Sequence, residues 1–390
     1  MSKAKHSHAW SLTGAARAAR EARISSAKFL ATPAMAQRHR GQIEWALGIH
    51  AIHNGGDLLR ALADLSRSLG YVLPYPDPDL LSELILQDEA RFLNGATLYV
   101  LSPDMTDVVV AAALTLTIED LELIHAETLP TQTGLIVLPH PLITRQLDGD
   151  LVDPRGFLWW HPARIALTLS KTVPAVHVAT YLDGHGPVQP ESWTDFTAMA
   201  AAAGTPVPPL LLNSMRSFPY KHRFTDAELQ ALDRFSSGAR QLGSSARILS
   251  AELGLHEDQV VGEYIPGQEI EDYDDLFSVK FLFAFWRLAE QRIALTEHAP
   301  VNHSAQVTVD RAGVSADVRV VRLRRTSERR TGDGSTGRVD WQHRWPVRMH
   351  KVRQWYPSLG THDLLWRGPY IKGPTDKPLI GGEQVWGLIR

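Results

Sequence analysis

Residues 274–295 limit the possible folds of this chain more than any other segment. Apolar side chains recur there every three or four residues, at Phe277, Phe281, Phe285 and Leu288, which is the period of an α-helix. A second set of apolar residues widens this stripe: Phe283, Trp286 and Ile293. A helix that is apolar around so much of its circumference is stable only when other elements cover it. We therefore expect this helix to be buried, with its aromatic side chains in the core.

Helices and short apolar strands alternate in the first half of the chain. Two apolar stripes within residues 41–70 predict two helices, which are separated by Asn54-Gly55-Gly56. Asp57 is placed to cap the second of them, and a third helix is expected over 79–92. Residues 108–117 are β-branched but rich in alanine, so they fit a strand or a helix. Four apolar runs predict strands: 97–101, 134–138, 157–160 and 175–182.

The second half of the chain changes from helical to strand-like. Prolines and glycines between 183 and 209 predict a connection or surface insertion that contains a short helix over 192–203. Residues 225–298 are expected to be helical, beginning with a capping box of Thr225 and Glu228 and including a separate helix over 243–253. Apolar and polar residues alternate from 339 to 350, as in a half-buried strand, and Pro346 places that strand at a sheet edge or a bulge.

These patterns predict an α+β fold with a mixed α/β N-terminal region, a central helical segment and a small C-terminal antiparallel β module. The basic N-terminal segment leaves three alternatives open, because it also fits a helix over 14–29 or an organellar transit peptide. The expected segments are a partly disordered basic arm (1–40), a mixed α/β domain (41–182), a Pro/Gly-rich connection (183–209), a helical segment (210–300) and a basic β-rich module (301–390).

Composition excludes several classes of protein. The chain has no cysteine, which rules out a disulfide framework, thiol catalysis, cysteine-ligated zinc and iron–sulfur clusters. Its longest apolar run, 108–118, is shorter than the roughly 20 residues of a membrane-spanning helix. No apolar stretch typical of a signal peptide follows the basic start. We expect a cytoplasmic protein that needs no cofactor, no metal and no membrane.

The net charge of −3 conceals a strong polarity along the chain. Residues 1–40 carry a local charge of +7, residues 41–316 carry −18, and residues 317–372 carry +8. Basic ends of this kind favour a polyanionic partner, whereas the acidic middle argues against a chain that wraps nucleic acid along its whole length. The alternative is that the basic ends and the acidic middle attract each other within the fold or in a dimer.

The basic segment from 318 to 372 holds the candidate binding site. Basic side chains neutralise phosphates, and exposed aromatic rings stack on unpaired bases, so this combination predicts a surface for RNA or single-stranded DNA. The alternative is that tryptophans of this segment form the core of a small sheet and its arginines a solvated face. The candidate nucleic-acid-binding residues are Arg322, Arg324, Arg325, Arg344, Arg348, Lys351, Arg353, Trp355, Tyr356 and Lys372.

Other local motifs favour structural roles. The glycine-rich segment 332–338 lacks the Gly-Lys-Ser/Thr of a phosphate loop and is expected to be a mobile hairpin loop. Residues 246–260 resemble half of a helix-turn-helix but offer acidic side chains, which DNA repels. His50 and His53 could share a helical face without a third metal ligand, and the acids within 269–275 lack the spacing of a calcium loop.

The same C-terminal segment carries a family resemblance, through Val318–Arg325, Trp341–His350, Arg353–Gly360 and Pro369–Pro374. It resembles the tail of a family of uncharacterised actinobacterial and phage proteins. It is also similar to the tail of a type V anti-CRISPR family that lowers expression of its target effector at the messenger-RNA stage. Met349 stands where the family has glycine, and Lys351 where it has an aromatic residue. The resemblance implies a mobile-element protein that acts on RNA or translation, and it supplies no catalytic residues.

Three functional hypotheses follow. The first is a non-enzymatic regulatory protein, linked to a phage or mobile element, that binds RNA or a ribonucleoprotein through the basic C-terminal module. The second is a metal-dependent nuclease or other phosphoryl-transfer enzyme that uses His343 or His350 for acid–base chemistry and Arg348 to stabilise charge. The third is a protein-interaction module, with a protein partner or a second copy of the chain as its ligand.

Overall fold

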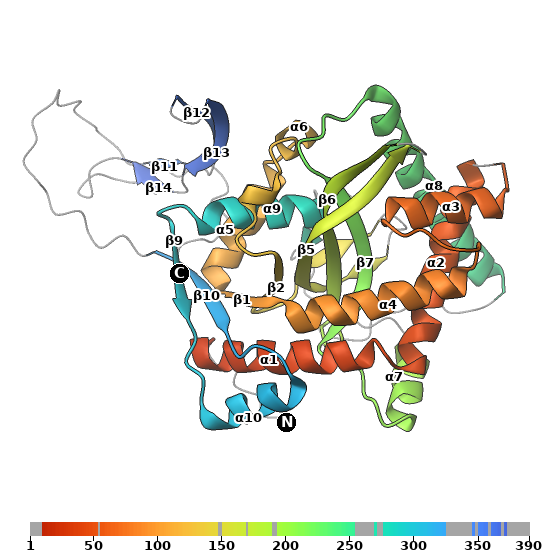
Figure 1. The fold of residues 1–390 in the computed structure, drawn as a ribbon, viewed down its shortest axis with the longest axis horizontal. Helices are drawn as coiled ribbons and strands as arrows, with labels where there is room; N and C mark the ends of the chain where they lie inside the picture. Colours follow the sequence, from red (N-terminus) through yellow and green to blue (C-terminus); the bar gives the residue numbers. More distant parts are fainter. Residues whose placement is uncertain are drawn as a thin grey trace, which may run out of the picture.

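A mixed β-sheet with helices on both faces forms the body of the molecule (Figure 1). The order of its seven strands is β7-β6-β5-β2-β1-β10-β9. Strand β1 runs parallel to both of its neighbours, β2 and β10, and the other neighbouring pairs are antiparallel. The computed structural model describes residues 10–53, 55–146, 150–168, 171–188, 193–253, 269–270, 276–324, 345–347, 350–357, 360–367 and 370–372.

The described elements have the following bounds. The helices are α1 (Leu12–Phe29), α2 (Pro33–His53), α3 (Leu58–Ser68), α4 (Pro78–Gly95), α5 (Pro103–Leu114), α6 (Ile118–Leu121), the 3₁₀ turn η1 (Ala126–Thr128), α7 (Trp193–Ala202), α8 (Asp226–Glu252), α9 (Phe277–Ala289) and α10 (His303–Ala312). The strands are β1 (Thr97–Leu101), β2 (Thr133–Val137), β3 (Ile143–Arg145), β4 (Leu151–Val152), β5 (Pro154–Thr168), β6 (Lys171–Asp183), β7 (Leu210–Pro219), β8 (Glu269–Ile270), β9 (Ala294–His298), β10 (Val318–Leu323), β11 (Trp345–Val347), β12 (His350–Tyr356), β13 (Thr361–Arg367) and β14 (Tyr370–Lys372).

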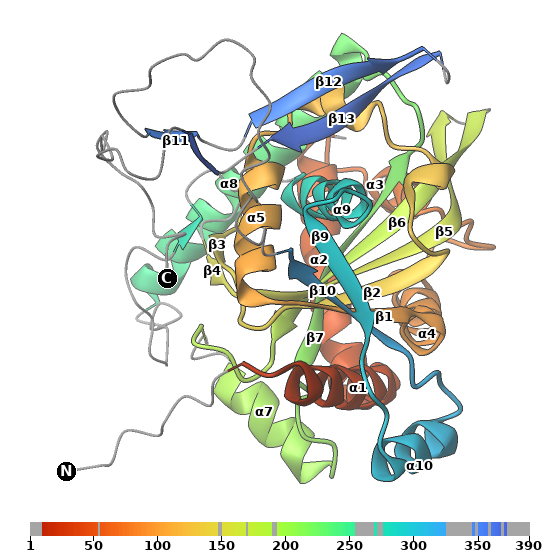
Figure 2. The same cartoon turned by 90° about the vertical axis from the view of Figure 1, so that its left-hand side faces the viewer.

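The sheet separates two hydrophobic cores, and α9 lies in the first of them (Figure 2). Phe281 stacks on Phe157 of β5 at a ring-centroid distance of 4.5 Å, and Trp286 meets Trp159 edge to face. Helix α5 packs beside α9 on this face, whereas α1 and α4 cover the opposite face. The expectation of a buried aromatic helix is therefore confirmed, as is the α+β fold class.

Helix α1 lies within the predicted basic arm and is built into the fold. Ser11 caps it by accepting a hydrogen bond from the Gly14 amide, and a row of alanines packs against the sheet. Two of its arginines are buried: Arg20 donates to the Ala316 carbonyl, and Arg23 donates to the carbonyls of Ala96 and Ser315. Of the three alternatives for this segment, the helix is the one found, because these cations satisfy carbonyl groups far along the chain.

Most predicted elements are confirmed, and four differ. Residues 294–298, at the end of the segment expected to be helical, instead form strand β9, which pairs with β10. Residues 108–117, left ambiguous above, lie largely in helix α5, where Pro103 and Asp104 occupy the first turn that suits them. The predicted separate helix over 243–253 is wrong, because α8 continues through Gly243; a single glycine costs a helix only about 1 kcal/mol. The predicted helical segment from 210 begins instead with strand β7, whose first residues are buried against β6.

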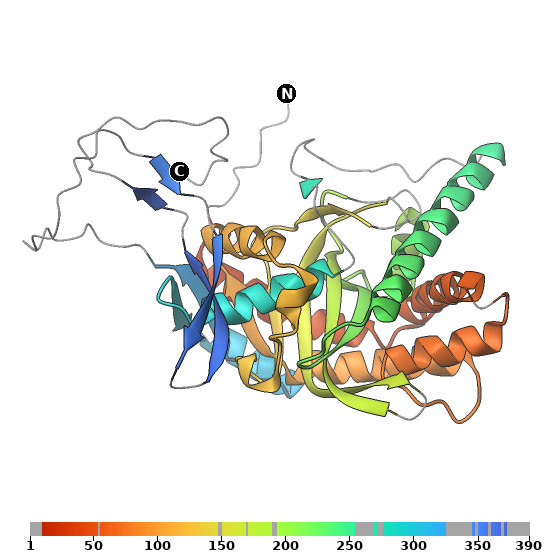
Figure 3. The ribbon, with the colours of Figure 1, turned by 90° about the horizontal axis from the view of Figure 1, so that it is seen from above.

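The hairpin of β12 and β13 docks on the helical face of the body (Figure 3). Leu364 and Trp366 are buried in the first core, and the Trp366 indole donates to the Thr115 hydroxyl over 3.2 Å. Arg287 of α9 forms an ion pair with Asp363 of β13. The expected C-terminal β module is thus found in this hairpin and in the pair β11–β14, where Pro346 lies opposite Ile371. Among the described helices, none is both long and apolar enough to cross a membrane.

Candidate functional site

A cavity of about 1310 Å³ lies along β7, which is an edge strand of the large sheet. Helix α2 lines one side and α8 another, and residues of α3, β3, β4 and β5 and of the segment between β3 and β4 also contribute to the described wall. In Figure 3, α8 lies at the end of the molecule opposite the β12–β13 hairpin. The cavity is therefore separate from the C-terminal site that the sequence predicts.

Local capping fixes the start of α8 beside this cavity. The predicted capping box is confirmed: the Glu228 carboxylate accepts from the Thr225 amide over 2.8 Å and from its hydroxyl over 2.9 Å. Burial acts to raise the pKa of Glu228, but the hydrogen bonds from Thr225 and the nearby His222 hold it below its usual value. One of the two acidic side chains in the described lining is thus already engaged in the structure of the wall.

Side chains of α1 and α2 satisfy carbonyl groups of β7. Arg38 donates to the Leu212 carbonyl and Gln42 donates to the Asn213 carbonyl, each over 2.8 Å. Ser26 of α1 donates to the Leu210 carbonyl over 2.7 Å. These bonds tie the first half of β7 to the helices and protect an edge strand from pairing with another chain.

The described lining of the cavity is cationic and aromatic. It contains four arginines, Arg38, Arg145, Arg216 and Arg247, against two acidic residues, Asp150 and Glu228, a net of two positive charges. Its aromatic side chains are Trp45, Phe218, Phe224 and Phe235. Such a wall matches a ligand with an apolar body and a negative group.

Two neighbouring members of the wall, Arg38 and His39, differ in charge at neutral pH. Burial lowers the pKa of Arg38 to about 10, so this guanidinium stays protonated. Burial, helped by the charge of Arg38, lowers the pKa of His39 to about 4, so the imidazole is neutral. His39 Nδ1 lies 2.7 Å from the hydroxyl of Ser82 on α4, which fixes the ring. The wall therefore offers a permanent cation next to a neutral imidazole.

A buried chain of polar groups ends at the cavity. Ser217 of β7 lines the cavity, and its Oγ lies 3.4 Å from Nδ1 of His177, its neighbour across the β6–β7 pair. His177 Nε2 lies 2.5 Å from Oε1 of Glu89 on α4, and the Tyr181 hydroxyl donates to Oε2 of the same carboxylate over 2.8 Å. Glu89 and His177 are 1% and 3% exposed. Ser217 is thus the only member of this chain that the described lining includes.

Several basic residues of the predicted nucleic-acid site form ion pairs within the protein. Lys351 and Arg353 of β12 both bind the buried carboxylate of Asp120, and Arg353 Nη2 lies 2.8 Å from it. Arg322 forms an ion pair with Glu297 of β9. Burial acts to raise the pKa of Asp120, but the bonds from Lys351, the Thr117 amide and Arg353 hold it below its usual value. Three of the predicted phosphate contacts therefore already have a carboxylate partner.

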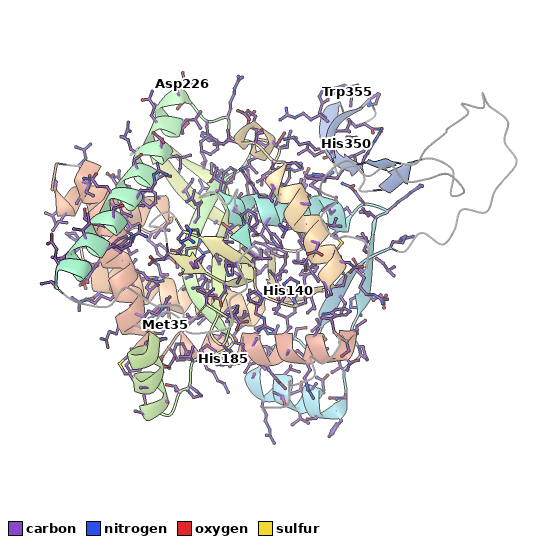
Figure 4. All side chains as sticks on the ribbon, turned by 180° about the vertical axis from the view of Figure 1, so that it is seen from behind. Met35, His140, His185, Asp226, His350 and Trp355 are labelled. Atoms are coloured by element: carbon purple, nitrogen blue, oxygen red, sulfur yellow. The ribbon has the colours of Figure 1, made fainter. Side chains whose placement is uncertain are left out.

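The remaining predicted residues lie in different settings. Trp355 is 49% exposed, with its ring centroid 4.9 Å from that of His362, and Figure 4 shows it on the hairpin with His350. Arg324 is exposed just after β10. Tyr356 and Lys372 lie on β12 and β14, and their side chains fall outside the described residues. Other predicted positions fall wholly outside them: Arg325, Arg344 and Arg348, together with His343 of the nuclease hypothesis.

The metal-ligand patterns in the sequence gain no support. The ring centroid of His50 lies 5.5 Å from that of Phe235 on α8, and the side chain of His53 is outside the described residues. Within the described part of the chain, no three His, Asp or Glu side chains are arranged to hold a metal ion. The phosphate-loop-like segment 332–338, together with 254–260 and 271–275, also falls outside it.

Sequence reasoning missed the cavity and the polar chain behind it. Glu89, His177 and Ser217 are separated by 88 and 40 residues, so no local motif joins them. One signal was present, because a histidine within the strongly apolar run 175–182 needs a buried partner. Comparison of the chain with protein-family models, with curated proteins and with solved structures gives no match.

Proposed function

We propose that this protein binds a small organic anion in the cavity between α2, β7 and α8. The observation that carries the proposal is the lining itself, which combines four arginines with two acidic residues and several aromatic side chains. The ligand class that fits is an aromatic or acyl body with a carboxylate, sulfonate or phosphate group. Arginine suits such groups, because its planar guanidinium pairs with them through two parallel hydrogen bonds.

The contacts of these arginines within the chain are compatible with ligand binding. Arg38 uses Nη1 for the Leu212 carbonyl. Arg145, Arg216 and Arg247 also make interactions within the protein. A guanidinium has five N–H donors, so a ligand can share it with the protein. The two sides of the cavity come from separate elements, so a bound anion would link α2 to α8 and stabilise the folded state.

Anilinonaphthalene sulfonate tests this proposal, because it combines an aromatic body with one negative charge. We expect saturable binding of one molecule to the native protein, measured by the increase in its fluorescence. N-phenylnaphthylamine has a similar aromatic body without the sulfonate, and it should bind at least tenfold more weakly. Equal affinity for the two dyes would contradict a cationic site.

A pair of variants on α8 locates the binding. Arg247 lines the cavity, whereas Arg234 is exposed on the same helix outside it. Arg247→Gln should lower the affinity for the sulfonate about tenfold, since a hydrogen bond to a charged group contributes roughly 1.5–3 kcal/mol. Arg234→Gln should leave the affinity unchanged. Loss of binding in both variants, or in neither, would place the dye elsewhere.

A second candidate function is RNA binding by the C-terminal module, as expected for a regulatory protein of a phage or mobile element. The observation that favours it is Trp355, an exposed aromatic side chain at the end of a strand that also carries Lys351 and Arg353. Stacking of a base on such a ring contributes roughly 1–3 kcal/mol. The pairing of both cations with Asp120 weakens this candidate relative to the cavity.

Fluorescence anisotropy with a mixed-sequence single-stranded RNA at two salt concentrations tests this second candidate. RNA binding through phosphates must weaken as salt rises. Trp355→Ala should weaken it further, whereas Tyr75→Ala, which removes an exposed ring in the segment before α4, should not. An Arg344/Arg348→Glu double variant should abolish binding. Absence of binding at low salt would eliminate this candidate.

A further inference from the structure

The geometry points to Ser217 as a nucleophile that His177 activates, which would make the cavity the active site of an esterase-type hydrolase. Three observations combine in this inference: a serine that lines the cavity, an imidazole nitrogen 3.4 Å from its hydroxyl, and a buried carboxylate on the far side of the ring. A nucleophile, a base and a group that orients the base are the parts that serine hydrolysis requires.

Hydrogen bonding selects the tautomer of His177 that can act as a base. An ionised Glu89 carboxylate has only acceptors, so the ring nitrogen that faces it at 2.5 Å must carry a proton. In the neutral ring the other nitrogen, Nδ1, then presents its lone pair to the Ser217 hydroxyl. The separation of 3.4 Å is long for a hydrogen bond, as catalytic contacts often are before substrate binds.

Burial holds the orienting carboxylate in place. Tyr181 is fully buried, and its hydroxyl donates to the second oxygen of Glu89, so both oxygens have partners. Burial raises the pKa of the Tyr181 phenol, and the nearby Glu89 carboxylate raises it further. The hydroxyl therefore remains a donor at neutral pH. Glu89 and Tyr181 are positioning residues in this scheme, because neither reaches the cavity.

The reaction balances with water as the only co-reactant. Ser217 Oγ attacks the carbonyl carbon of an ester while its proton moves to His177 Nδ1. The tetrahedral intermediate collapses when the bond to the alcohol oxygen breaks, and the proton passes from Nδ1 to the departing alkoxide. Water then attacks the acyl-serine, gives its proton to Nδ1 and releases a carboxylic acid, after which Ser217 recovers its proton.

This inference rests on the proposed function for its substrate class, because the arginines of the same wall would bind a negative group on the ester. The substrate expected is therefore a carboxylic ester with an aromatic or acyl body and a second, anionic group. The nucleophile itself can be tested without that ligand, so the two proposals can fail separately.

A fluorophosphonate probe tests the nucleophile, because it forms a covalent phosphoryl bond only with an activated serine. We expect one modification, which mass spectrometry places on Ser217. Ser214 is an internal control, because it lies on the same strand with Thr180, not a histidine, as its cross-strand neighbour and should stay unmodified. Ser217→Ala should abolish the modification, and Ser244→Ala on the exposed part of α8 should leave it unchanged.

The positioning residues need a readout that a structural role would not change. Glu89→Gln should lower the rate of modification about 100-fold, within the range of general-base catalysis, and should also change its dependence on pH. Tyr181→Phe keeps the ring and should lower the rate less. A cooperative thermal unfolding transition shows that each variant is folded. An unmodified Ser217 in protein that unfolds cooperatively, or equal rates for wild type and Glu89→Gln, would overturn the inference.

Discussion

Asp153 and Asp183 bring two carboxylates together in the interior. Within the part of the chain that the structure describes, only Asp183 has a cationic partner. Asp153 is 1% exposed and Asp183 is 2% exposed, and Arg155 donates to Asp183 over 2.5 Å. The Val188 amide donates to Oδ2 of Asp153 over 3.3 Å, and Oδ1 has no hydrogen-bond partner among the described residues. Burial, together with the charge of Asp183, raises the pKa of Asp153 from 3.8 to about 8. Asp153 is therefore protonated in the native protein at neutral pH.

The raised pKa makes Asp153 a source of instability that grows with pH. Between pH 4 and pH 8 the native state holds a proton that the unfolded state has released, so the free energy of unfolding falls as pH rises. Each pH unit above 3.8 costs about 1.4 kcal/mol in this window. The cost is about 2 kcal/mol at pH 5 and about 4 kcal/mol at pH 7.

Asp153→Asn removes this titration and keeps the size of the side chain, and its amide oxygen can still accept from the Val188 amide. We expect the variant to be more stable than the wild type by about 2 kcal/mol at pH 5 and about 4 kcal/mol at pH 7. Urea unfolding followed by tryptophan fluorescence at both pH values gives the comparison. Asp233→Asn, at an exposed position of α8, is the matched control and should change neither value. A stability difference that is the same at both pH values would refute the reasoning.

Two further substitutions test how the hairpin and the sheet are packed. Asp120→Ala leaves the two cations of β12 without their buried carboxylate, so the hairpin should become sensitive to limited proteolysis and the melting temperature should fall by an amount that corresponds to roughly 1–3 kcal/mol. Because the pKa of Asp120 is held below its usual value, this contribution should be present at neutral pH and be lost as the pH falls through that pKa. Gly134→Ala places a methyl group 2.2 Å from the Trp159 ring and should destabilise the protein by roughly 1–3 kcal/mol in thermal unfolding. Gly95→Ala, where no atom lies within 4 Å, should be neutral or stabilising, and an equal loss in both variants would contradict the packing argument.

Local sequence patterns predicted the strands that consist mainly of apolar residues. They did not predict strands that contain polar residues and depend on contacts with distant parts of the chain. The strand over 97–101 is apolar from Leu98 onward and ends at Ser102-Pro103, and it coincides with β1. Strand β7 contains Asn213 and Arg216, and only its pairing with β6 and its contacts with α2 make it a strand. Propensity alone could not supply those contacts.

The same limit explains the candidate sites. The sequence gives the net charge of residues 317–372 but not the partners of the individual cations. Lys351 and Arg353 contact a carboxylate more than 230 residues away in the sequence, that of Asp120. The four arginines of the cavity come from α2, β3, β7 and α8, so they form no cluster in the sequence. The prediction of RNA binding through the C-terminal module stays a prediction, with fewer unpaired cations than the sequence suggested.

The anchoring of α1 has a consequence for how the chain matures during synthesis. Its buried arginines bind carbonyls of residues 315 and 316, and β1 obtains one of its two parallel neighbours from residues 318–321. Ribosomes add about 5–20 residues per second, so α1 waits about 15–60 s for partners that lie 296 residues downstream. During that time these two arginines lack the carbonyls of residues 315 and 316, and one edge of β1 has no native partner. A nascent chain released before residue 315 would therefore expose both to chaperones and proteases.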